Sequence, residues 1–389
     1  MHEIVIVKAL RTPIGTYKGS LKNISADKLG SEIIKNLILQ SNLSKDEIDE
    51  IILGQVLTAG GGQNPARQAS INSGLPVSKP AHIINQVCGS GLRAIVSGYQ
   101  SIMLNDAKIV IAGGQENMSK APHSIFFRDK KKLNEDELSD TMISDGLIDA
   151  FNNYHMGVTA ENIAEKFKIS RDQQDEYALN SQFKAKKAID KKLFKNELIK
   201  ISDQNNSVIL EKDEHPRTDL TTADLKKLTT VFKKNGTVTP GNSSGINDGA
   251  AGVIITTKKI AESKNLEILG KIVSWSSVGV DPSLMGLGPI DAIRIALKKA
   301  NWKIEDVDLF EINEAFAAQS IAVINVLNLE HDKINVNGGA IALGHPIGAS
   351  GARVVVTLLH EMKRRNVNKG CVSLCIGGGM GIAMCFERN

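Results

Sequence analysis

Apolar residues along the chain fall into two kinds of run, which alternate. Short continuous runs such as "IDEIILG" (48–54) and "AKIVIAGG" (107–114) have the length and composition of buried strands. Between them, "CGSGLRAIVSGYQSI" (88–102) opens on glycines and then places apolar residues at helical spacing. This alternation predicts an α/β protein, in which helices cover the faces of a sheet.

The same order of elements occurs again near the C-terminus. The segment "KIEDVDLFEIN" (303–313) repeats the pattern of "SKDEIDEIILG" (44–54). A second glycine-opened helix follows in "IGASGARVVVTLLHEM" (347–362), and a second strand ending in glycines in "GCVSLCIGGG" (370–379). Repetition of whole elements at one long period indicates an internal duplication.

The spacing within the two copies also agrees. Asp49 precedes Arg93 by 44 positions, and Asp308 precedes Arg353 by 45 positions. Because both the residue types and their spacing recur, we expect the two halves to pack as a pseudo-twofold pair.

Between the halves the sequence becomes polar, and we expect an inserted, mostly helical and loop-rich lid domain at 119–241. Helical patterns such as that of 159–189 favour a lid over a disordered linker. The N-terminal half is then expected at 1–118, completed by about 242–268. The C-terminal half is expected at 269–389.

Composition and charge exclude several classes of function. The 389 residues carry a formal net charge of +4 with no basic stripe, so we expect no nucleic-acid partner. The opening "MHEIVIVKALRTPIG" (1–15) lacks the pattern of a signal or membrane segment, and "CFERN" (385–389) lacks that of a peroxisomal address, so we expect neither. The four cysteines lack zinc-ligand spacing, so we expect no metal. Free cysteines also suit a reducing compartment, and since no membrane segment is expected, we expect no membrane partner and a cytoplasmic location.

The first candidate for chemistry is Cys88, in "NQVCGSGLRAI" (85–95). It lies between a β-rich run and a helix expected to begin near Gly89. A helix N-terminus favours a thiolate, because backbone N–H groups there lack partners and the macrodipole is positive. Free cysteines are also among the most buried and inert residues, so both a nucleophile and a small buried side chain fit this position.

The second candidate is His345, in the glycine-dense segment "NVNGGAIALGHPIGASGAR" (335–353). A histidine in a rigid loop can serve as a general base near neutral pH. Two other interpretations are that the glycines only form turns, or that the loop cradles a phosphate. The segment matches neither G-x-G-x-x-G nor the Walker pattern, which disfavours phosphate binding.

Three more groups lie at the ends of expected strands. Cys375 precedes consecutive glycines, whose N–H groups suit either an oxyanion or an ordinary hairpin turn. Asn313 and Glu314 lie where a strand passes into a helix, a place where a polar residue is often only an N-cap. Strand ends are the usual place for an active site in α/β folds. One thiol would there hold an acyl group as a thioester, and the second would move a proton.

These segments resemble the three signatures of the thiolase family: "NQVCGSGLRAI" around Cys88, "NVNGGAIALGHPIGASGAR" around His345 and "CIGGGMG" around Cys375. The likeness runs from "RTPIG" (11–15) to "CIGGGMG", with "NEAFAAQ" in the expected place between. The resemblance implies a duplicated, layered α/β/α/β/α core with an inserted lid domain. It is strongest to members that join two acetyl-CoA molecules into acetoacetyl-CoA and free CoA.

The resemblance also implies a role for each reactive residue. Cys88 would take the acetyl group while His345 draws off its proton, and Cys375 would act as base on the methyl carbon of the second acetyl-CoA. One oxyanion hole would combine His345 with a water held by Asn313, and the other would use the backbone N–H groups of Cys88 and Gly377. Coenzyme A thioesters are then substrates, and no separate cofactor is expected.

For coenzyme A, the resemblance implies contacts from the lid and from "GNSSGINDGA" (241–250). Ser244 is expected to contact the pantetheine arm, and Arg217 the phosphate-bearing end, because a guanidinium suits phosphate geometry. The acyl pocket is expected to be lined by His155, Met156, Met285 and Leu147. Methionines there would fill space and favour a short acyl chain.

The chain departs from the family pattern at two places. Thr230 in "KLTTVF" stands where relatives have proline, and "GGQENMS" (113–119) stands where "GGMESMS" is expected. Neither change affects a proposed catalytic residue.

Three other functions compete with the condensation of acetyl-CoA. A degradative 3-ketoacyl-CoA thiolase would run the same chemistry on longer chains. A ketoacyl synthase uses Cys-His-His, and Asn313 in place of a second histidine argues against it. A non-catalytic CoA-binding scaffold would keep the fold without the reaction. Family members are usually tetramers, so the resemblance implies a homotetramer.

Overall fold

The computed structural model of the chain describes residues 3–128, 132, 134–203 and 205–388. Residues 129–131, 133 and 204 of the expected lid therefore lie outside the described part. In the N-terminal half, strands and helices alternate as the apolar runs predict. Their bounds are β1 Ile4–Arg11, β2 Gly15–Thr16, α1 Ala26–Leu39, β3 Glu50–Gly54, α2 Pro65–Asn72, β4 Ala81–Ile84, α3 Ser90–Met103 and β5 Ile109–Asn117.

The described part of the insertion contains short strands, three α-helices and a six-residue π-helix. Their bounds are β6 His123–Ser124, β7 Ser139–Asp140, the π-helix Met142–Leu147, α4 Met156–Phe167, α5 Arg171–Asp190, β8 Ile201–Ser202, β9 Val208–Leu210 and α6 Thr222–Lys226. The remaining elements are β10 Asn247–Thr257, α7 Lys258–Ser263, β11 Gly270–Gly279, α8 Gly288–Ala300, β12 Leu309–Ile312, α9 Ala317–Leu327, α10 Ala340–Leu343, α11 Ser350–Arg365, β13 Lys369–Ile376 and β14 Met380–Glu387.

Ten of the described strands form one sheet. Its order is β12-β13-β14-β11-β1-β10-β5-β3-β4, with β2 beside β10. The two halves join where β1 pairs antiparallel with β11, through Val5 with Lys271 and Ile6 with Gly270. After the insertion the chain returns to the first half, because β10 pairs with both β1 and β5.

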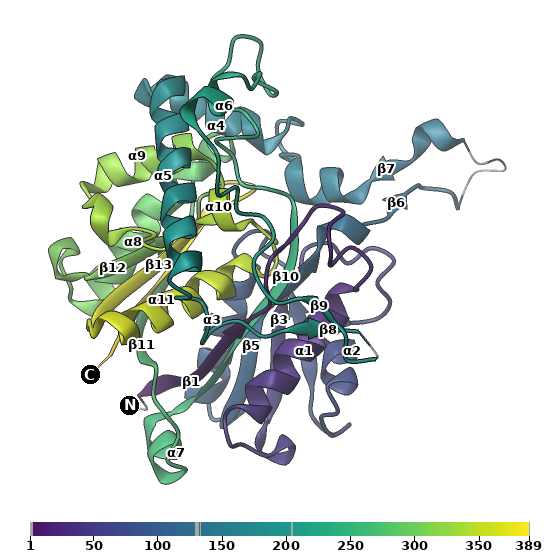
Figure 1. Cartoon of the computed structure of the whole chain (residues 1–389). Coiled ribbons are helices and arrows are strands. Elements are labelled where there is room, and N and C mark those ends of the chain that lie inside the picture. Colours follow the sequence, from purple (N-terminus) through teal and green to yellow (C-terminus); the bar gives the residue numbers. More distant parts are fainter. Residues whose placement is uncertain (1–2, 129–131, 133, 204, 389) are drawn as a thin grey trace.

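Helices cover both faces of each half of this sheet (Figure 1). Helices α3 and α11 share one apolar cluster with strands of both halves, including β5, β10, β13 and β14, and so form the middle layer. Helices α1 and α2 cover the outer face of the first half, and α8 and α9 that of the second. Strands that are buried on both faces need apolar residues at every position, and this explains the continuous apolar runs in the sequences of these strands. These layers confirm the predicted α/β/α/β/α arrangement.

Two aspartates show the duplication at the level of single hydrogen bonds. Asp49 Oδ2 accepts from the backbone N–H groups of Ile109 and of the residue before it, at 2.9 and 2.8 Å. Asp308 Oδ2 accepts from Lys369 and the residue before it, at 2.8 and 3.0 Å. Each aspartate therefore fixes the start of the equivalent strand, β5 or β13.

The two middle helices cross at equivalent glycines. A Cβ on Gly91 of α3 would lie 2.7 Å from the backbone nitrogen of Ala352, and one on Gly351 of α11 would lie 2.3 Å from that of Leu92. Real side chains do not tolerate such distances, so the backbones meet directly only because both residues are glycine. This contact holds the two helix N-termini side by side.

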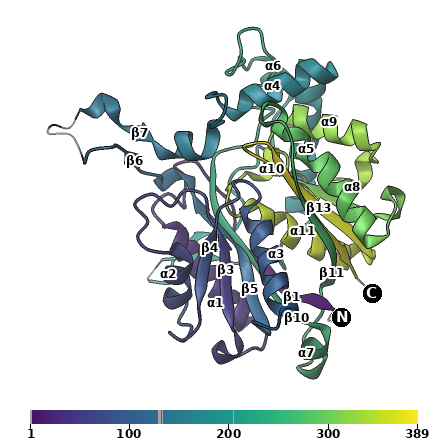
Figure 2. The same cartoon turned by 180° about the vertical axis from the view of Figure 1, so that it is seen from behind.

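The insertion consists of two parts that differ in position. The β6–β7 hairpin projects from the body of the molecule (Figures 1 and 2), whereas α4 and α5 pack on α9, and α5 also contacts α10. The helical part therefore covers the C-terminal half, as expected of a lid.

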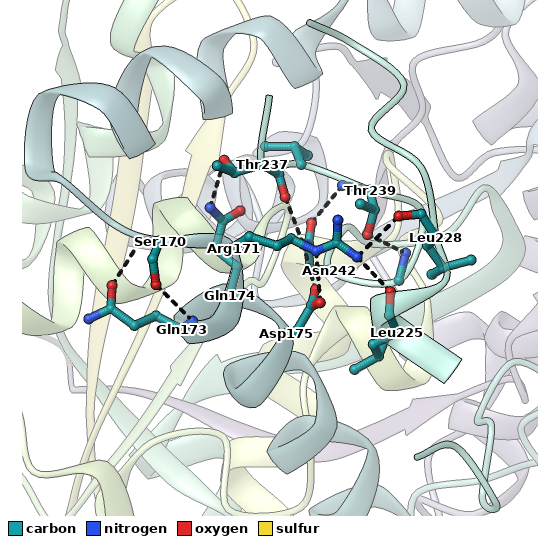
Figure 3. A network of polar contacts seen from close by, with 12 residues as sticks. Ser170, Arg171, Gln173, Gln174, Asp175, Leu225, Leu228, Thr237, Thr239 and Asn242 are labelled. Carbon is teal, nitrogen blue, oxygen red and sulfur yellow. Dashed lines mark hydrogen bonds and ion pairs between the residues drawn. The ribbon is translucent and has the colours of Figure 1, made fainter. Parts of the chain in front are cut away.

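A polar network fixes this helical part (Figure 3). Arg171 at the start of α5 pairs with Asp175 at 2.7 Å and donates to the carbonyl oxygens of Leu225 and Leu228. Asn242, just before β10, donates to the other oxygen of Asp175 at 2.9 Å. The network joins α5 to the end of α6 and to the segment that precedes β10.

Candidate active site

A cavity of about 610 Å³ lies between the insertion and the strand ends. This volume suits a small-molecule substrate. Its walls combine Tyr17 of the first half, Phe232 of the insertion and Phe316 of the second half. Five of the residues singled out in the sequence line it: Leu147, His155, Arg217, Ser244 and His345.

Cys88 lies in a tight turn between β4 and α3 and is 9% exposed. The preceding Val87 has φ of 45°, a conformation that is strained for a β-branched residue. Ser90, the first residue of α3, stabilises the turn by accepting from the Gln86 N–H at 2.9 Å and donating to the Val87 carbonyl at 2.6 Å. The backbone N–H groups of Gly377 and of Cys88 itself contact the sulfur.

The thiol of Cys88 is protonated at neutral pH. Burial raises the pKa of Cys88 to about 11, and the nearby Glu116 carboxylate raises it further, although the N–H groups of Gly377 and Cys88 lower it. The expectation of a thiolate at this helix N-terminus is therefore wrong for the free protein, because lost hydration outweighs the N–H groups and the dipole. The thiol needs a base when it reacts.

His345 can supply that base. Its Nδ1 lies 2.6 Å from Ser350 Oγ, and that hydroxyl donates to the Pro346 carbonyl at 2.9 Å. All three groups are satisfied when Nδ1 carries the proton, which leaves Nε2 as an unprotonated acceptor. Burial, and then the charge of Arg353, lower the pKa of His345 to about 3, so the ring is neutral and accepts a proton at Nε2.

Asn313 lies beside this nitrogen. Its Nδ2 is 3.5 Å from His345 Nε2, and its buried Oδ1 has no hydrogen-bond partner in the described part of the chain. Helix α9 is capped at Phe316, so the N-cap interpretation of Asn313 and Glu314 is wrong. Glu314 instead accepts hydrogen bonds inside the protein, including one from Ser181 at 2.7 Å.

Cys375 ends β13 and is fully buried. Burial and the proximity of Cys88 raise its pKa far above the ordinary value, so it is also a neutral thiol. Met156, Met285 and Phe316 belong to its apolar cluster. The two methionines therefore pack around Cys375, and their expected place in the acyl pocket stays a prediction.

The glycines after Cys375 serve both uses that the sequence suggested. Gly377 to Gly379 form the turn between β13 and β14. Gly379 has φ of 83°, and a Cβ on it would lie 2.3 Å from the Val280 carbonyl oxygen, so only glycine fits. The same turn directs the Gly377 N–H to the Cys88 sulfur.

The outer cavity carries the residues expected to contact coenzyme A. Arg217 is exposed at its rim, and Ser244 is held by its backbone N–H, which donates to the Ala315 carbonyl at 3.0 Å. The His155 ring stacks on Phe232, with centroids 4.5 Å apart. Burial lowers the pKa of His155, so it presents a neutral face.

Sequence reasoning missed several residues of this site. Ser350 stands five positions after His345 in the same glycine-dense segment, 335–353. A hydroxyl side chain at the start of the expected helix was the signal that could have indicated its contact with the His345 ring. Met118 and Met142 share an apolar cluster with Cys88, but nothing local marks them, because the contacts are long-range. Glu116 lies in a polar end, Gln115 to Asn117, of a strand that begins apolar, and a carboxylate there was a usable signal.

Within the described residues, no cluster of histidine, cysteine or carboxylate side chains could hold a metal ion. Likewise, none of the described helices is both long and apolar enough to cross a membrane.

Comparison with known proteins identifies the family. Residues 4–259 match the model of the thiolase N-terminal domain, and residues 266–388 match that of the thiolase C-terminal domain. The chain belongs to the thiolase family. It is 51% identical over 393 residues to an acetyl-CoA acetyltransferase of Pseudomonas aeruginosa, covering 100% of both chains. It is 49% identical over 390 residues to the cytosolic acetyl-CoA acetyltransferase of Rattus norvegicus, covering 99% of this thiolase and 98% of the relative.

A solved structure confirms the thiolase fold. The crystal structure of human mitochondrial 3-ketoacyl-CoA thiolase in complex with CoA has a TM-score of 0.95 to this chain. The two are 41% identical, and the match covers 100% of this thiolase and 98% of the other chain.

The pKa values lead to a testable pH dependence. With a pKa of about 11, roughly one Cys88 thiol in 300 is ionised at pH 8.5. Only the thiolate reacts with iodoacetamide, so alkylation of Cys88 in the free protein should rise about tenfold per pH unit up to about pH 10. Peptide mapping across that range measures it. A plateau already reached near pH 7 would show that Cys88 is an activated thiolate after all.

Proposed function

We propose that this thiolase is an acetyl-CoA C-acetyltransferase, which condenses two acetyl-CoA molecules into acetoacetyl-CoA and CoA and also runs the reverse thiolysis. The observation that carries the proposal is the proximity of two buried neutral thiols, Cys88 and Cys375, together with the loop of the neutral His345, whose Ile347 packs in the apolar cluster of Cys88. Relatives about half identical over their full length bear this name.

In the first step, His345 Nε2 takes the proton of Cys88, and the thiolate attacks the thioester carbonyl of acetyl-CoA. The oxyanion accepts hydrogen bonds from the N–H groups of Cys88 and Gly377, which already converge at the sulfur. When the carbon–sulfur bond to CoA breaks, the departing thiolate takes a proton from Cys375. His345 is then an imidazolium, Cys375 a thiolate, and Cys88 an acetyl thioester.

In the second step, the Cys375 thiolate removes a proton from the methyl group of a second acetyl-CoA. The protonated Nε2 of His345 donates to the enolate oxygen, and Asn313, 3.5 Å away, lies where it can assist. The enolate carbon attacks the acetyl group, and Cys88 leaves and regains its proton from His345. Both thiols and the neutral ring are thereby restored.

We further propose a short acyl chain. The Cys88 cluster contains Leu57, Met118, Met142 and Ile347, with Leu147 packed against it. Close apolar packing around the thiol leaves room for an acetyl group more readily than for a long chain. A degradative 3-ketoacyl-CoA thiolase is the second candidate, favoured by the likeness to the human structure of that name.

Assembly and location complete the proposal. A homotetramer is supported by the projecting β6–β7 hairpin, where Phe126 is 98% exposed, and by β4 at one edge of the described sheet. A cytoplasmic location is supported by the rat relative, which is named cytosolic. Acetyl-CoA, acetoacetyl-CoA and CoA are the proposed ligands.

Substrate range tests the function. The purified protein should cleave acetoacetyl-CoA with CoA. Its kcat/KM should fall at least tenfold for 3-ketoacyl-CoA substrates with acyl chains of eight or more carbons, because the acyl chain must fit among the apolar side chains packed beside Cys88. Loss of the 3-ketoacyl-CoA absorbance measures both. Equal rates along the series would favour the degradative thiolase, and no cleavage by a folded sample would favour the scaffold.

The second thiol has its own test. Cys375→Ala should lower kcat for thiolysis by about 100-fold to 10,000-fold, because it removes the group that moves a proton in both steps. Cys371→Ala is the matched control, since Cys371 is equally buried on the same strand and shares its cluster with Cys385. It should keep most of its activity. Similar losses in both variants would mean that Cys375 has only a packing role.

A further inference from the structure

Glu116 is a fully buried carboxylate in β5 that the mechanism above does not use. Its Oε2 accepts from the backbone N–H groups of Val56 at 3.0 Å and Gly348 at 2.9 Å. Its Oε1 accepts from the N–H of Leu57 at 3.2 Å. No lysine or arginine of the described residues forms an ion pair with it. Burying a carboxylate without a cationic partner costs free energy, so we expect the contacts of Glu116 to serve a specific role.

The three groups that Glu116 binds belong to the segments that surround Cys88. Val56 and Leu57 follow β3 and share the apolar cluster of Cys88. Gly348 follows Ile347, another member of that cluster, in the loop that carries His345. One carboxylate therefore ties the wall beside the nucleophile to the loop of its base.

The contact at Gly348 is too close for adjustment. A Cβ on this glycine would lie 2.7 Å from Glu116 Oε2 and 2.8 Å from the Cα of Gln55. The loop backbone therefore meets both the carboxylate and the segment after β3, and a shorter acid at position 116 would not reach it.

The charge of Glu116 also acts on Cys88. Burial raises the pKa of Glu116 to about 7, against the three N–H groups, and Asp248 on the adjacent β10 raises it further. Above that pH the carboxylate is ionised, and it raises the pKa of the Cys88 thiol. The titratable groups involved are thus Glu116 on β5, Asp248 on β10 and Cys88 before α3.

We propose that Glu116 is a positioning residue for acetyl transfer. Its two oxygens hold the Val56–Leu57 segment and the His345 loop around Cys88, while its charge adds to the effect of burial, which keeps the free thiol protonated until His345 takes the proton. The expected change in kcat rests on the proposed function, whereas the expected change in the alkylation rate of Cys88 does not depend on it.

Two variants separate the length of the Glu116 side chain from its negative charge. In Glu116→Gln the amide oxygen can still accept from Val56 and Gly348, but the charge and the acceptor for the Leu57 N–H are lost. Cys88 should then be alkylated by iodoacetamide about threefold to tenfold faster at pH 9 than in the wild type, because the carboxylate no longer raises the pKa of the thiol. In Glu116→Asp the charge stays but the reach is lost. Alkylation should stay within twofold of wild type, while kcat for acetoacetyl-CoA thiolysis should fall at least tenfold.

Glu361→Gln is the matched control. Glu361 is a buried carboxylate of α11, hydrogen-bonded by Asn337, Arg364 and Arg365, and lies about 16 Å along the helix from Ser350. It should change neither rate by more than twofold. Thermal melting of each variant confirms folding before the rates are compared.

The outcomes are distinct. Unchanged alkylation in Glu116→Gln would overturn the electrostatic part, and undiminished kcat in Glu116→Asp would overturn the positioning part. Parallel loss of both rates in both variants, with lowered melting temperature, would reduce Glu116 to a structural role. If the wild type itself lacks thiolysis, the proposed function fails, and the alkylation of Glu116→Gln still decides the charge effect.

Discussion

The structure depends on the direct contact between the backbones of α3 and α11, where Gly91 and Gly351 leave no room for a side chain. Each helix is preceded by a turn that carries a reactive residue, and each begins with a serine whose hydroxyl holds that turn. Ser90 donates to Val87 before α3, and Ser350 donates to the loop of His345 before α11. Because the helices touch at their starts, a thiol from one half and an imidazole from the other share one site. The duplication is thus the reason that the site exists.

Burial then determines the chemistry of the site. Removal from water raises the pKa of both thiols and lowers that of His345, so all three groups are neutral before substrate binds. A neutral thiol can donate a proton and a neutral imidazole can accept one, and both changes reverse when the reaction runs backwards. This suits a reversible reaction in which Cys375 acts first as an acid and then as a base. It also protects Cys88 from reaction in the absence of a substrate.

Much of this architecture could be predicted from the sequence, because it is written in local patterns. Apolar periodicity indicated the alternating elements, and the repeated spacing from Asp49 and Asp308 indicated the duplication that their hydrogen bonds now display. The positions of Cys88 before α3 and of the glycine turn after Cys375 followed from their neighbours in sequence.

What the sequence did not reveal depends on contacts between distant segments. The thiolate expected at Cys88 was wrong because local reasoning includes the helix N-terminus but not the depth of burial. The packing of Met156 and Met285 around Cys375 joins three distant segments, so no local pattern could specify it. The role inferred for Glu116 requires partners 60 and 232 positions away, which no local pattern specifies.

The central claim is that Cys88 carries the acetyl group between the two substrates. The most direct test is to mix the protein with acetyl-CoA, quench in acid within the first turnovers, and locate any acetyl group by peptide mass spectrometry. The account predicts a thioester on the peptide that contains Cys88, and unmodified peptides for Cys371, Cys375 and Cys385. Formation of acetoacetyl-CoA with no acetyl group on Cys88 at any time would contradict it.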